Sequence, residues 1–563
     1  MKNGVPHRST DSNCYKKMVS LIWTHIVCAG CLFTMVSSQA AETNAAELKE
    51  WQDMRFGMFI HWGPVSLKGT EIGWSRGAQI PVEDYDQLYT RFNPTLFNAE
   101  DWAQVAKTAG MQYLVFTSKH HDGFCMWDTK QTDFNIMRSP FARDVLKELS
   151  AACQIHGIRF STYHSVCDWH HPDFPRTSPG GRVRREKHDL DRYDAYLRAQ
   201  VKELITNYGP LQTMWFDVPQ EFDEKRGLAL EAWTRSLQAN IIINNRSGAS
   251  GDYDTPEQRV GKYQDDRPWE TCMTICRQWA WKPNDDMKTL KDCLQNLIRC
   301  AGGDGNLLFN VGPMPDGRIE VRQVKRLKAM GAWLQQNGES IYATRGGPWK
   351  PTNAVASTRK GNTIFVHAMR FEENQLALPK LDRTIVKASL RDGTNVPVKQ
   401  TNDQWLLSVS EQKQDPIDTI IRLEFDRSAM DIPALALAAE VEGSASNVYQ
   451  NNVHSYGADM AFDNDRETRW ATDDGVNQAW IMGDLGKPRT IQRIRIEEAL
   501  GQRVRSFEFQ YKTGKEWKTL FTGESIGRWF QKKLDTPITT TAFRLNILDA
   551  SEGPTIADIE FFE

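Results

Sequence analysis

The sequence has few cysteines for its length, and their spacing forms no recognisable pattern. It has 563 residues and 10 cysteines, three of which precede residue 41. The other seven are Cys125, Cys153, Cys167, Cys272, Cys276, Cys293 and Cys300. An odd number without a Cys-x-x-Cys pair argues against a disulfide framework and against a zinc site. Cys272 and Cys276 lie four residues apart, and we interpret them as small buried hydrophobic residues.

The sequence also lacks an excess of charge of either sign. Lys and Arg number 69 and Asp and Glu number 72, which gives a formal net charge of -3. This balance gives no general electrostatic reason to expect nucleic acid as a partner. We find no internal repeat, no long low-complexity segment and no membrane-spanning stretch after residue 40.

One long apolar run does occur, at the N-terminus. Lys16 and Lys17 precede a mainly apolar stretch over 18–36, and Ser38-Gln39-Ala40 then gives a small-x-small cleavage pattern. We therefore predict a signal peptide over 1–40 and an exported, periplasmic or secreted protein. Outer-membrane lipid anchoring at Cys31 and an uncleaved anchor are the alternatives.

Hydrophobic and aromatic residues are plentiful. Hydrophobic residues make up 40% of the chain, and there are 19 Trp. This content suits two or three globular domains with ample cores. Any one Trp can simply be core, but Trp near polar clusters together suit a sugar platform, because the apolar faces of a pyranose stack on aromatic rings.

Helix and strand patterns alternate over about 48–342. We expect helices over 100–108, 144–156 and 192–208, and strands over 113–117 and 158–163. A late strand over 306–313 and a closing helix over 320–337 follow. The fold class predicted is α/β, with a (β/α) TIM-like barrel as the catalytic domain over 41–345.

The pattern then changes to short alternating runs. Runs over 363–367, 384–390, 404–408 and 417–425 predict a small β-sandwich over 346–430. A linker leads to a further all-β region, which we expect to form a β jelly roll over 431–563.

Polar residues recur at the ends of the expected barrel strands. The run Met214-Trp215-Phe216 ends on Asp217, and the strand over 113–117 leads into Lys119-His120-His121-Asp122-Gly123. Another run, over 241–243, leads to Asn244-Asn245-Arg246. Because a barrel assembles its active site at the C-terminal face, these residues should converge on one pocket.

Six ordered segments carry a family resemblance. They are Met58-Phe59-Ile60-His61-Trp62-Gly63, Lys119-His120-His121-Asp122-Gly123-Phe124, Trp215-Phe216-Asp217, Thr255-Pro256-Glu257, Trp269-Glu270-Thr271-Cys272 and Asn306-Leu307-Leu308-Phe309-Asn310-Val311-Gly312-Pro313. The chain thus resembles the family 29 glycoside hydrolases, the α-L-fucosidases. The resemblance implies a retaining exo-glycosidase that removes terminal α-L-fucose from fucosylated oligosaccharides or glycoconjugates and needs no catalytic cofactor or metal.

The resemblance also implies catalytic carboxyl groups. Asp217 matches the nucleophile position, and Glu257 is our preferred acid/base, with Glu270 as the alternative. A retaining glycosidase holds its two carboxyl groups about 5–5.5 Å apart and passes through a glycosyl-enzyme. The acid/base needs a raised pKa, which desolvation or a nearby carboxylate could supply.

Further residues match positions that contact the sugar in the family. They are His61, Trp74, His120, His121, Tyr163, Trp215 and Arg246, of which Trp74 could face the C6 methyl group. One departure is Ile72-Gly73-Trp74, where many members have Glu-Trp. The carboxylate that often binds sugar hydroxyls is therefore absent or displaced to Glu71.

The last region resembles a coagulation-factor type C, or discoidin-like, domain that is also used as a carbohydrate-binding module. The matching segments are Ala461-Phe462-Asp463-Asn464-Asp465, Thr468-Arg469-Trp470, Trp480-Ile481-Met482-Gly483-Asp484-Leu485-Gly486 and Ile556-Ala557-Asp558-Ile559-Glu560. The resemblance implies a possible structural calcium ion near Asp463, Asp465, Thr468 and Glu560, since calcium prefers oxygen ligands. A purely structural domain without sugar affinity is the alternative.

Two other functions stay open at this point. One is a glycosidase for α-L-galactosides, which a polar wall around the C6 position would favour. The other is an inactive fucose-binding lectin, against which the retention of Asp217, Glu257 and Glu270 argues. Within the fucosidase hypothesis, narrow α-1,3/1,4 activity on branched Lewis-type glycans and broad activity on simple aryl fucosides both stay open.

Overall fold

The computed structural model describes Met1 and residues 44–435, 441–463 and 468–562. The expected signal peptide, the Cys31 anchor and Asp465 lie outside the described residues. The chain divides into two units, which we describe separately. The first comprises most of the barrel sequence up to Asp254, with 278–285 and 311–324, and the second comprises the remainder.

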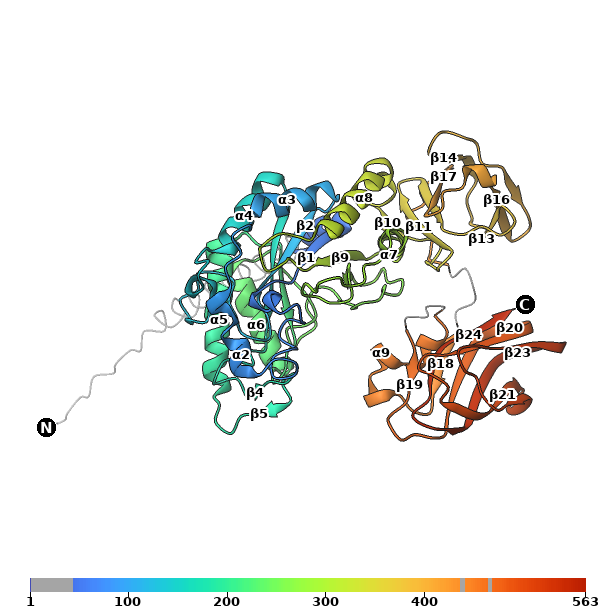
Figure 1. Ribbon diagram of the computed structural model, residues 1–563. Helices are drawn as coiled ribbons and strands as arrows, with labels where there is room; N and C mark the ends of the chain where they lie inside the picture. The colour runs from blue at the N-terminus through green and yellow to red at the C-terminus, as the bar shows by residue number, and fades with distance from the viewer. Residues whose placement is uncertain (2–43, 436–440, 464–467, 563) are drawn as a thin grey trace. The chain divides into compact units, whose positions relative to one another are not determined.

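The first unit is built on a parallel sheet (Figure 1). Its strands are β1 (Phe56–Ile60), β2 (Tyr113–Lys119), β3 (Arg159–Ser165), β6 (Thr213–Asp217) and β7 (Ile242–Ile243). They pair in parallel in the order β7-β6-β3-β2-β1. Nearly every residue in these strands is buried, as expected for a parallel sheet covered on both faces.

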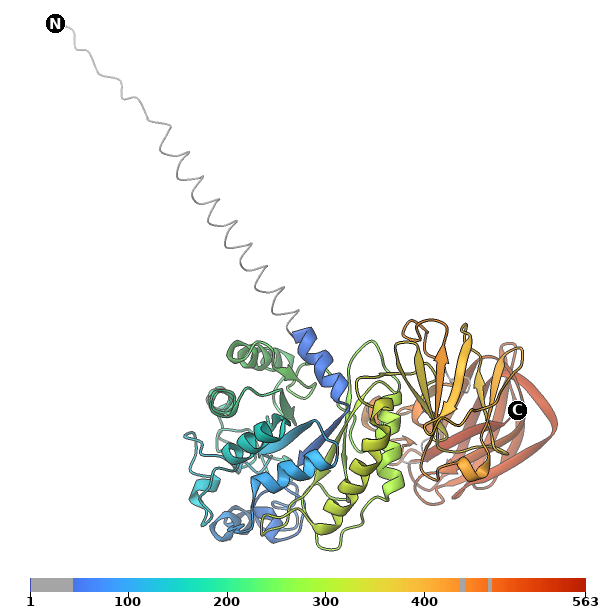
Figure 2. The same ribbon diagram turned by 90° about the horizontal axis from the view of Figure 1, so that it is seen from above.

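Helices connect these strands and lie around their outer side (Figure 2). They are α2 (Val82–Asp86), α3 (Ala99–Thr108), α4 (Val145–His156), α5 (Leu190–Tyr208) and α6 (Glu224–Leu237). Asn98, Asp144 and Asp189 cap the N-termini of α3, α4 and α5 with their side chains. Gly157 ends α4 at φ 65°, a left-handed conformation that glycine adopts without steric cost.

The second unit contains the later barrel elements. Strands β8 (Glu270–Thr274) and β9 (Asn306–Val311) pair in parallel, and α7 (Leu290–Gly302) connects them. Helix α8 (Val321–Asn337) follows β9. The alternation of parallel strands with helices confirms the predicted TIM-like catalytic domain.

A small antiparallel β-sandwich follows, as predicted. One sheet has the order β10-β11-β12-β17-β14 and the other β13-β16-β15. These strands are β10 (Arg345–Gly346), β11 (Val355–Lys360), β12 (Thr363–Ala368), β13 (Gln375–Pro379), β14 (Ile385–Leu390), β15 (Val398–Gln400), β16 (Gln404–Ser408) and β17 (Thr419–Phe425). Trp349, Trp405 and Phe425 form much of its buried core.

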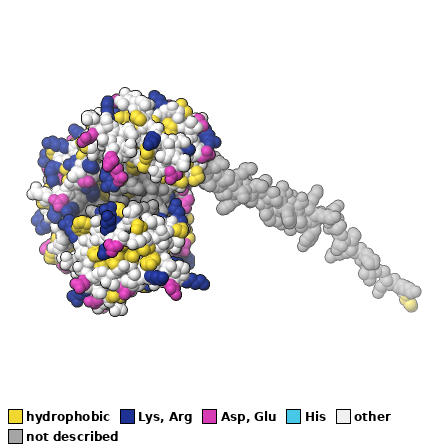
Figure 3. All heavy atoms as spheres, turned by 90° about the vertical axis from the view of Figure 1, so that its right-hand side faces the viewer, with side chains coloured by type: hydrophobic (Ala, Val, Ile, Leu, Met, Phe, Trp, Pro, Cys, Tyr) yellow, Lys and Arg dark blue, Asp and Glu magenta, His cyan; other side chains and the backbone are white. Residues whose placement is uncertain are grey.

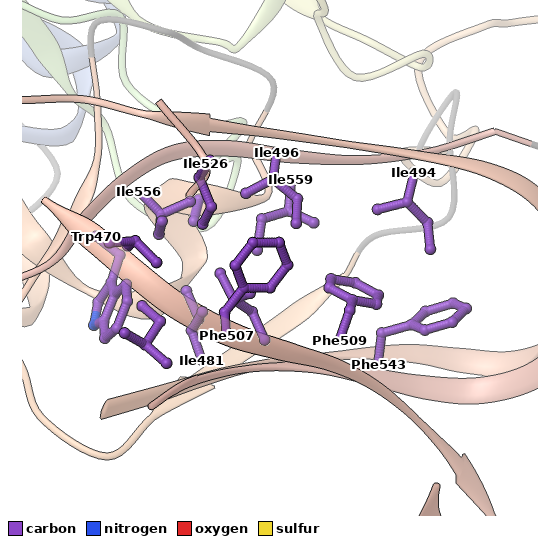
Figure 4. Packing of buried hydrophobic residues seen from close by; sticks show 14 of the residues in the cluster. Trp470, Ile481, Ile494, Ile496, Phe507, Phe509, Ile526, Phe543, Ile556 and Ile559 are labelled. Atoms are coloured by element: carbon purple, nitrogen blue, oxygen red, sulfur yellow. The ribbon is translucent and has the colours of Figure 1, made fainter. Parts of the chain in front are cut away.

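The C-terminal region is the expected jelly roll-like β domain. Its strands are β18 (Glu442–Ala445), β19 (Trp470–Ala471), β20 (Ala479–Glu498), β21 (Val504–Thr513), β22 (Glu516–Gly523), β23 (Phe530–Ala550) and β24 (Thr555–Phe562). The long strand β20 pairs with β18, β23 and β24 along different parts of its length. Figure 4 shows the core, in which Phe507, Phe509 and Phe543 pack with Trp470 and isoleucines from neighbouring strands.

The described surface agrees with the balanced composition. On the face shown in Figure 3, cationic and anionic side chains are intermixed, and hydrophobic side chains form small groups. Within the described ranges, no helix combines the length and apolarity required to cross a membrane.

Two local features differ from the expectation. The strand expected over 241–243 is reduced to Ile242–Ile243, because the Ile241 N–H bonds back to the Gln238 carbonyl and Ile241 belongs to the turn before the strand. A hairpin of β4 (Arg176–Thr177) and β5 (Val183–Arg184) was not foreseen, since its two-residue strands give no hydrophobic alternation.

Candidate active site

Asp217 is the last residue of β6, and other groups hold both of its carboxylate oxygens. The Tyr163 hydroxyl, from β3, donates to Oδ2 at 2.8 Å. Arg246, on the loop after β7, donates to Oδ1 through Nη1 at 3.1 Å. Residue Val218 then turns away with φ 48°, so the strand ends at the carboxylate. The structure therefore brings Asp217 and Arg246 together, as the strand-end pattern predicted, and places beside them Tyr163, which the family resemblance had named.

Three histidines surround this carboxylate and Tyr163. His121 places Nε2 at 3.8 Å from Oδ2 of Asp217, and its Nδ1 lies 2.7 Å from Oγ of Ser165. The rings of His120 and Tyr163 are stacked with centroids 5.4 Å apart. His61 lies 5.4 Å from Tyr163 and 5.5 Å from His120, measured between ring centroids. Polar groups that follow β1 and β2 thus meet the end of β3.

Aromatic rings form a wall beside the polar groups. Trp215 stacks on Tyr163 at a centroid distance of 5.5 Å, and the Arg246 guanidinium lies 5.0 Å from the Trp215 ring centroid. Phe59 contacts Trp215, and Trp279 contacts His61 at 4.9 Å. The sequence predicted no site role for Phe59, whereas Trp279 was among the Trp residues considered for a sugar platform. Trp279 belongs to a Trp-x-Trp segment, which was the available signal.

The surroundings of Asp217 favour its ionised form. Burial alone would raise the pKa of this carboxyl, but the positive charge of Arg246 and the hydrogen bonds from Tyr163 and Arg246 lower it. The net effect holds the pKa of Asp217 below its ordinary value. Asp217 is therefore an anion near neutral pH, as a nucleophile must be.

His120 and His121 are neutral under the same conditions. Burial lowers the pKa of His121 to about 4, although the nearby Asp217 carboxylate opposes the shift. Burial also places the pKa of His120 well below its ordinary value, and its histidine neighbours lower it further. A neutral imidazole has one donor and one acceptor nitrogen, so these side chains can bind sugar hydroxyls without competing charge.

Trp74 lies at the rim of this cluster. Its side chain is 45% exposed, and its ring centroid lies 5.5 Å from His121 and 5.1 Å from Trp169. The ring thus offers an accessible apolar face close to the buried polar groups.

Glu71, the possible replacement for the missing family carboxylate, is engaged elsewhere. Its carboxylate accepts backbone N–H bonds from Trp279 and Ala280, both at 3.0 Å, and from Ile72 at 3.1 Å. Burial raises the pKa of Glu71, which these backbone donors partly oppose. Glu71 therefore fixes the segment that places Trp279 beside His61.

Removing this anchor has a measurable consequence. We expect Glu71→Ala to lower the free energy of unfolding by about 1–3 kcal/mol, because buried backbone donors lose their acceptor. Urea denaturation monitored by Trp fluorescence measures the change. Glu83→Ala is the matched control, since Glu83 is an exposed carboxylate of the neighbouring helix α2. If the two variants had equal free energies of unfolding, Glu71 would not anchor the segment that carries Trp279.

The two candidates for the acid/base lie in the second unit and differ in their surroundings. Glu257 is exposed, and its neighbours are fixed to β8 by the bonds Gln258 N–H to Cys272 O at 2.9 Å and Cys272 N–H to Pro256 O at 3.0 Å. Glu270 is only 1% exposed and is the first residue of β8.

The expected calcium site can be compared with the described C-terminal residues. Thr468 donates to Asp463, and Arg495 forms an ion pair with Glu560. Both carboxylate oxygens of Asp558 are buried, and burial together with the nearby Glu560 and Asp463 raises its pKa above the ordinary value. Within the described ranges, however, no group of three or more acidic, His or Cys side chains is placed to hold a metal ion. The calcium ion stays a prediction.

Comparisons with known proteins agree with this geometry. A family model described as Alpha-L-fucosidase matches residues 34–339, and a model of the F5/8 type C domain matches 442–561. The plasma alpha-L-fucosidase of Homo sapiens is 29% identical over 344 residues, which cover 55% of this chain and 72% of that protein.

Solved structures show the same similarity. Alpha-L-fucosidase isoenzyme 1 from Paenibacillus thiaminolyticus has a TM-score of 0.63 and 33% identity, covering 68% of this chain and all of that one. A GH29 alpha-L-fucosidase from Bacteroides thetaiotaomicron, solved as a trapped covalent intermediate with 2-fluoro-fucosyl fluoride, has a TM-score of 0.62 and 26% identity, covering 68% and 96%. The chain belongs to the α-L-fucosidase family of glycoside hydrolases, family 29, and carries an F5/8 type C domain at its C-terminal end.

Proposed function

We propose that this protein is a retaining exo-α-L-fucosidase in which Asp217 forms a covalent fucosyl-enzyme. The observation that carries the proposal is the ionised strand-end carboxylate, held by Tyr163 and Arg246 and placed near neutral His120 and His121. A carboxylate oxygen fixed in this way can attack the anomeric carbon of a bound fucose. The covalent intermediate trapped in the Bacteroides thetaiotaomicron relative supports the same two-step chemistry.

Glu257 is our proposed acid/base. This group protonates the leaving oxygen in the first step and activates water in the second, so it needs access to water. The exposed carboxyl of Glu257 on a fixed backbone meets that need better than the buried carboxyl of Glu270. Glu270 also begins its strand, whereas catalytic groups in this fold come from the C-terminal ends of strands.

Fucose is proposed to bind between the histidines and the aromatic wall. His61, His120 and His121 offer donors and acceptors for the sugar hydroxyls, as the family resemblance implies. The rings of Trp215 and Phe59 supply apolar surface close by, with centroids 5.3 Å apart. An apolar wall suits the C6 methyl group of fucose better than the C6 hydroxyl of an α-L-galactoside, because a buried hydroxyl without a partner costs free energy.

Export of the protein belongs to the same proposal. The apolar run over 18–36 and its cleavage pattern indicate a signal peptide, and a relative is named a plasma enzyme. An exported enzyme would meet fucosylated oligosaccharides or glycoconjugates outside the cytoplasm. The seven cysteines of the described residues are all buried, and none of them forms a disulfide there.

A substrate panel tests the proposal. We expect the mature protein to hydrolyse an aryl α-L-fucoside, and proton NMR should show α-L-fucose as the first product, since two inversions retain the configuration. A matched aryl α-L-galactoside should react at least about tenfold more slowly, which corresponds to about 1.4 kcal/mol. A first-formed β-anomer would exclude retention, and binding of fucose without hydrolysis would favour the lectin. A branched Lewis trisaccharide in the same panel reports the linkage.

A further inference from the structure

We propose that the β4–β5 hairpin forms an acceptor subsite in which Arg182 binds an anionic group, a sulfate ester or a carboxylate, on the sugar that carries the fucose. The inference rests on the proposed fucosidase function and adds the chemical class of the preferred substrate. It is carried by three features of the hairpin: its attachment to the loop after Asp217, its close approach to Trp74, and the free charge at its tip.

The hairpin is fixed to the segment that follows the nucleophile. Arg176 in β4 and Arg184 in β5 both donate to the carboxylate of Glu221, four residues after Asp217. On the opposite side, Arg76 donates through Nη1 to Ser178 Oγ at 3.0 Å. These bonds join the hairpin to both sides of the active-site rim, so its tip has a defined position. Figure 1 shows the hairpin close to α2, the helix that follows the Trp74 segment.

The tip of the hairpin borders the exposed aromatic ring at the rim. A Cβ atom added to Gly180 would lie 3.4 Å from the Trp74 ring and 3.9 Å from Nε of Arg182, so the loop backbone passes close to both side chains. Trp74 in turn contacts His121, whose Nε2 lies 3.8 Å from the Asp217 carboxylate. A continuous series of neighbouring groups thus leads from the nucleophile to the hairpin tip. The sugar next to a bound fucose can therefore stack on Trp74 and reach the tip.

The hairpin and the residues just after it carry an excess of positive charge. The cations are Arg176, Arg182, Arg184, Arg185 and Lys187, against the single acid Glu186. Most of the arginines have structural partners: Arg176 and Arg184 bind Glu221, and Arg185 donates to the backbone oxygen of Trp169 at 2.7 Å.

Arg182 is the exception. Its side chain is exposed, and it forms no hydrogen bond or ion pair with the described residues. It stands two residues after Gly180, the position whose backbone passes close to Trp74. A guanidinium group presents a planar fork of donors that matches the oxygens of a sulfate or a carboxylate. A free guanidinium beside an aromatic platform therefore favours an acceptor sugar with a negative charge.

The test compares matched substrates on the mature wild-type protein. Three fucosylated disaccharides are used: one neutral, one with a sulfate ester on the acceptor sugar, and one with a carboxylate there. We expect kcat/KM to be about fivefold to tenfold higher for at least one anionic substrate than for the neutral one. A charge-assisted contact at a partly exposed site has an effect of this size. The preference should decrease at 0.5 M salt, because exposed charges are screened.

Variants then assign the preference to one residue. Arg182→Gln should bring the ratio of anionic to neutral kcat/KM to about one, whereas Lys187→Gln, a charge change farther along the same segment, should keep it. A wild-type ratio of one, or a ratio that Arg182→Gln leaves unchanged, overturns the inference. If an aryl fucoside is cleaved but no charge preference exists, only this inference fails. If no fucoside is cleaved, titration calorimetry measures the binding affinity for the same disaccharides instead. Equal affinity for the neutral and anionic disaccharides then overturns the inference.

Discussion

Asp217→Asn is expected to lower kcat by about 10⁴-fold or more, because it removes the group that forms the covalent intermediate. The amide is nearly isosteric with the carboxylate and can still accept the bond from Tyr163, so the fold should be retained. Initial rates with an aryl α-L-fucoside, together with a thermal unfolding curve, measure the two effects separately.

A variant with a smaller side chain at position 217 tests by chemical rescue whether Asp217 is the nucleophile. With Asp217→Gly, azide can enter the vacated space and attack the anomeric carbon directly, which gives a fucosyl azide of inverted, β configuration. Ser165→Gly is a useful control, since it removes the hydroxyl partner of His121 without touching the carboxylate. If Asp217→Asn kept a tenth or more of the wild-type rate while remaining folded, another residue would be the nucleophile.

Glu257→Ala is expected to have the second largest effect, a loss of about 10²–10⁴-fold for substrates with a sugar leaving group. The loss should be much smaller in the first step for an aryl fucoside with an acidic phenol, because that leaving oxygen needs little protonation. Rates for a series of aryl fucosides of different phenol pKa measure this dependence.

Azide separates the two candidate glutamates. It should accelerate turnover of Glu257→Ala and yield the α-fucosyl azide, since it replaces the water that the missing base would activate. Glu270→Ala should respond differently: its buried position at the start of β8 predicts lower stability and no rescue by azide. Rescue of Glu270→Ala alone would reverse the assignment.

Much of the fold could be predicted because its periodicity is strong. The expected helix over 192–208 is observed as Leu190–Tyr208, and the expected strand over 404–408 as Gln404–Ser408. Apolar runs that end abruptly on polar residues also placed Asp217 and His121 correctly at strand ends. These features depend on local sequence, so local reasoning finds them.

Other features depend on contacts between distant segments and could not be predicted in this way. Glu71 accepts bonds from backbone N–H groups 208 and 209 residues later, and no sequence pattern encodes that pairing. The β4–β5 hairpin owes its position to Glu221 and Arg76 rather than to its own two-residue strands. The pKa of Asp217 likewise follows from Arg246 and Tyr163, which only the folded chain brings together.

The most direct test of the account is to label the wild-type protein with 2-fluoro-fucosyl fluoride and locate the label by peptide mass spectrometry. The fluorine slows both steps, and the fluoride leaving group lets the first proceed, so the fucosyl-enzyme accumulates. We expect one 2-fluorofucosyl group per chain, attached to Asp217, with loss of activity at the same rate as labelling. Complete inactivation with the label on any other residue, or turnover that never forms a covalent adduct, would contradict this expectation.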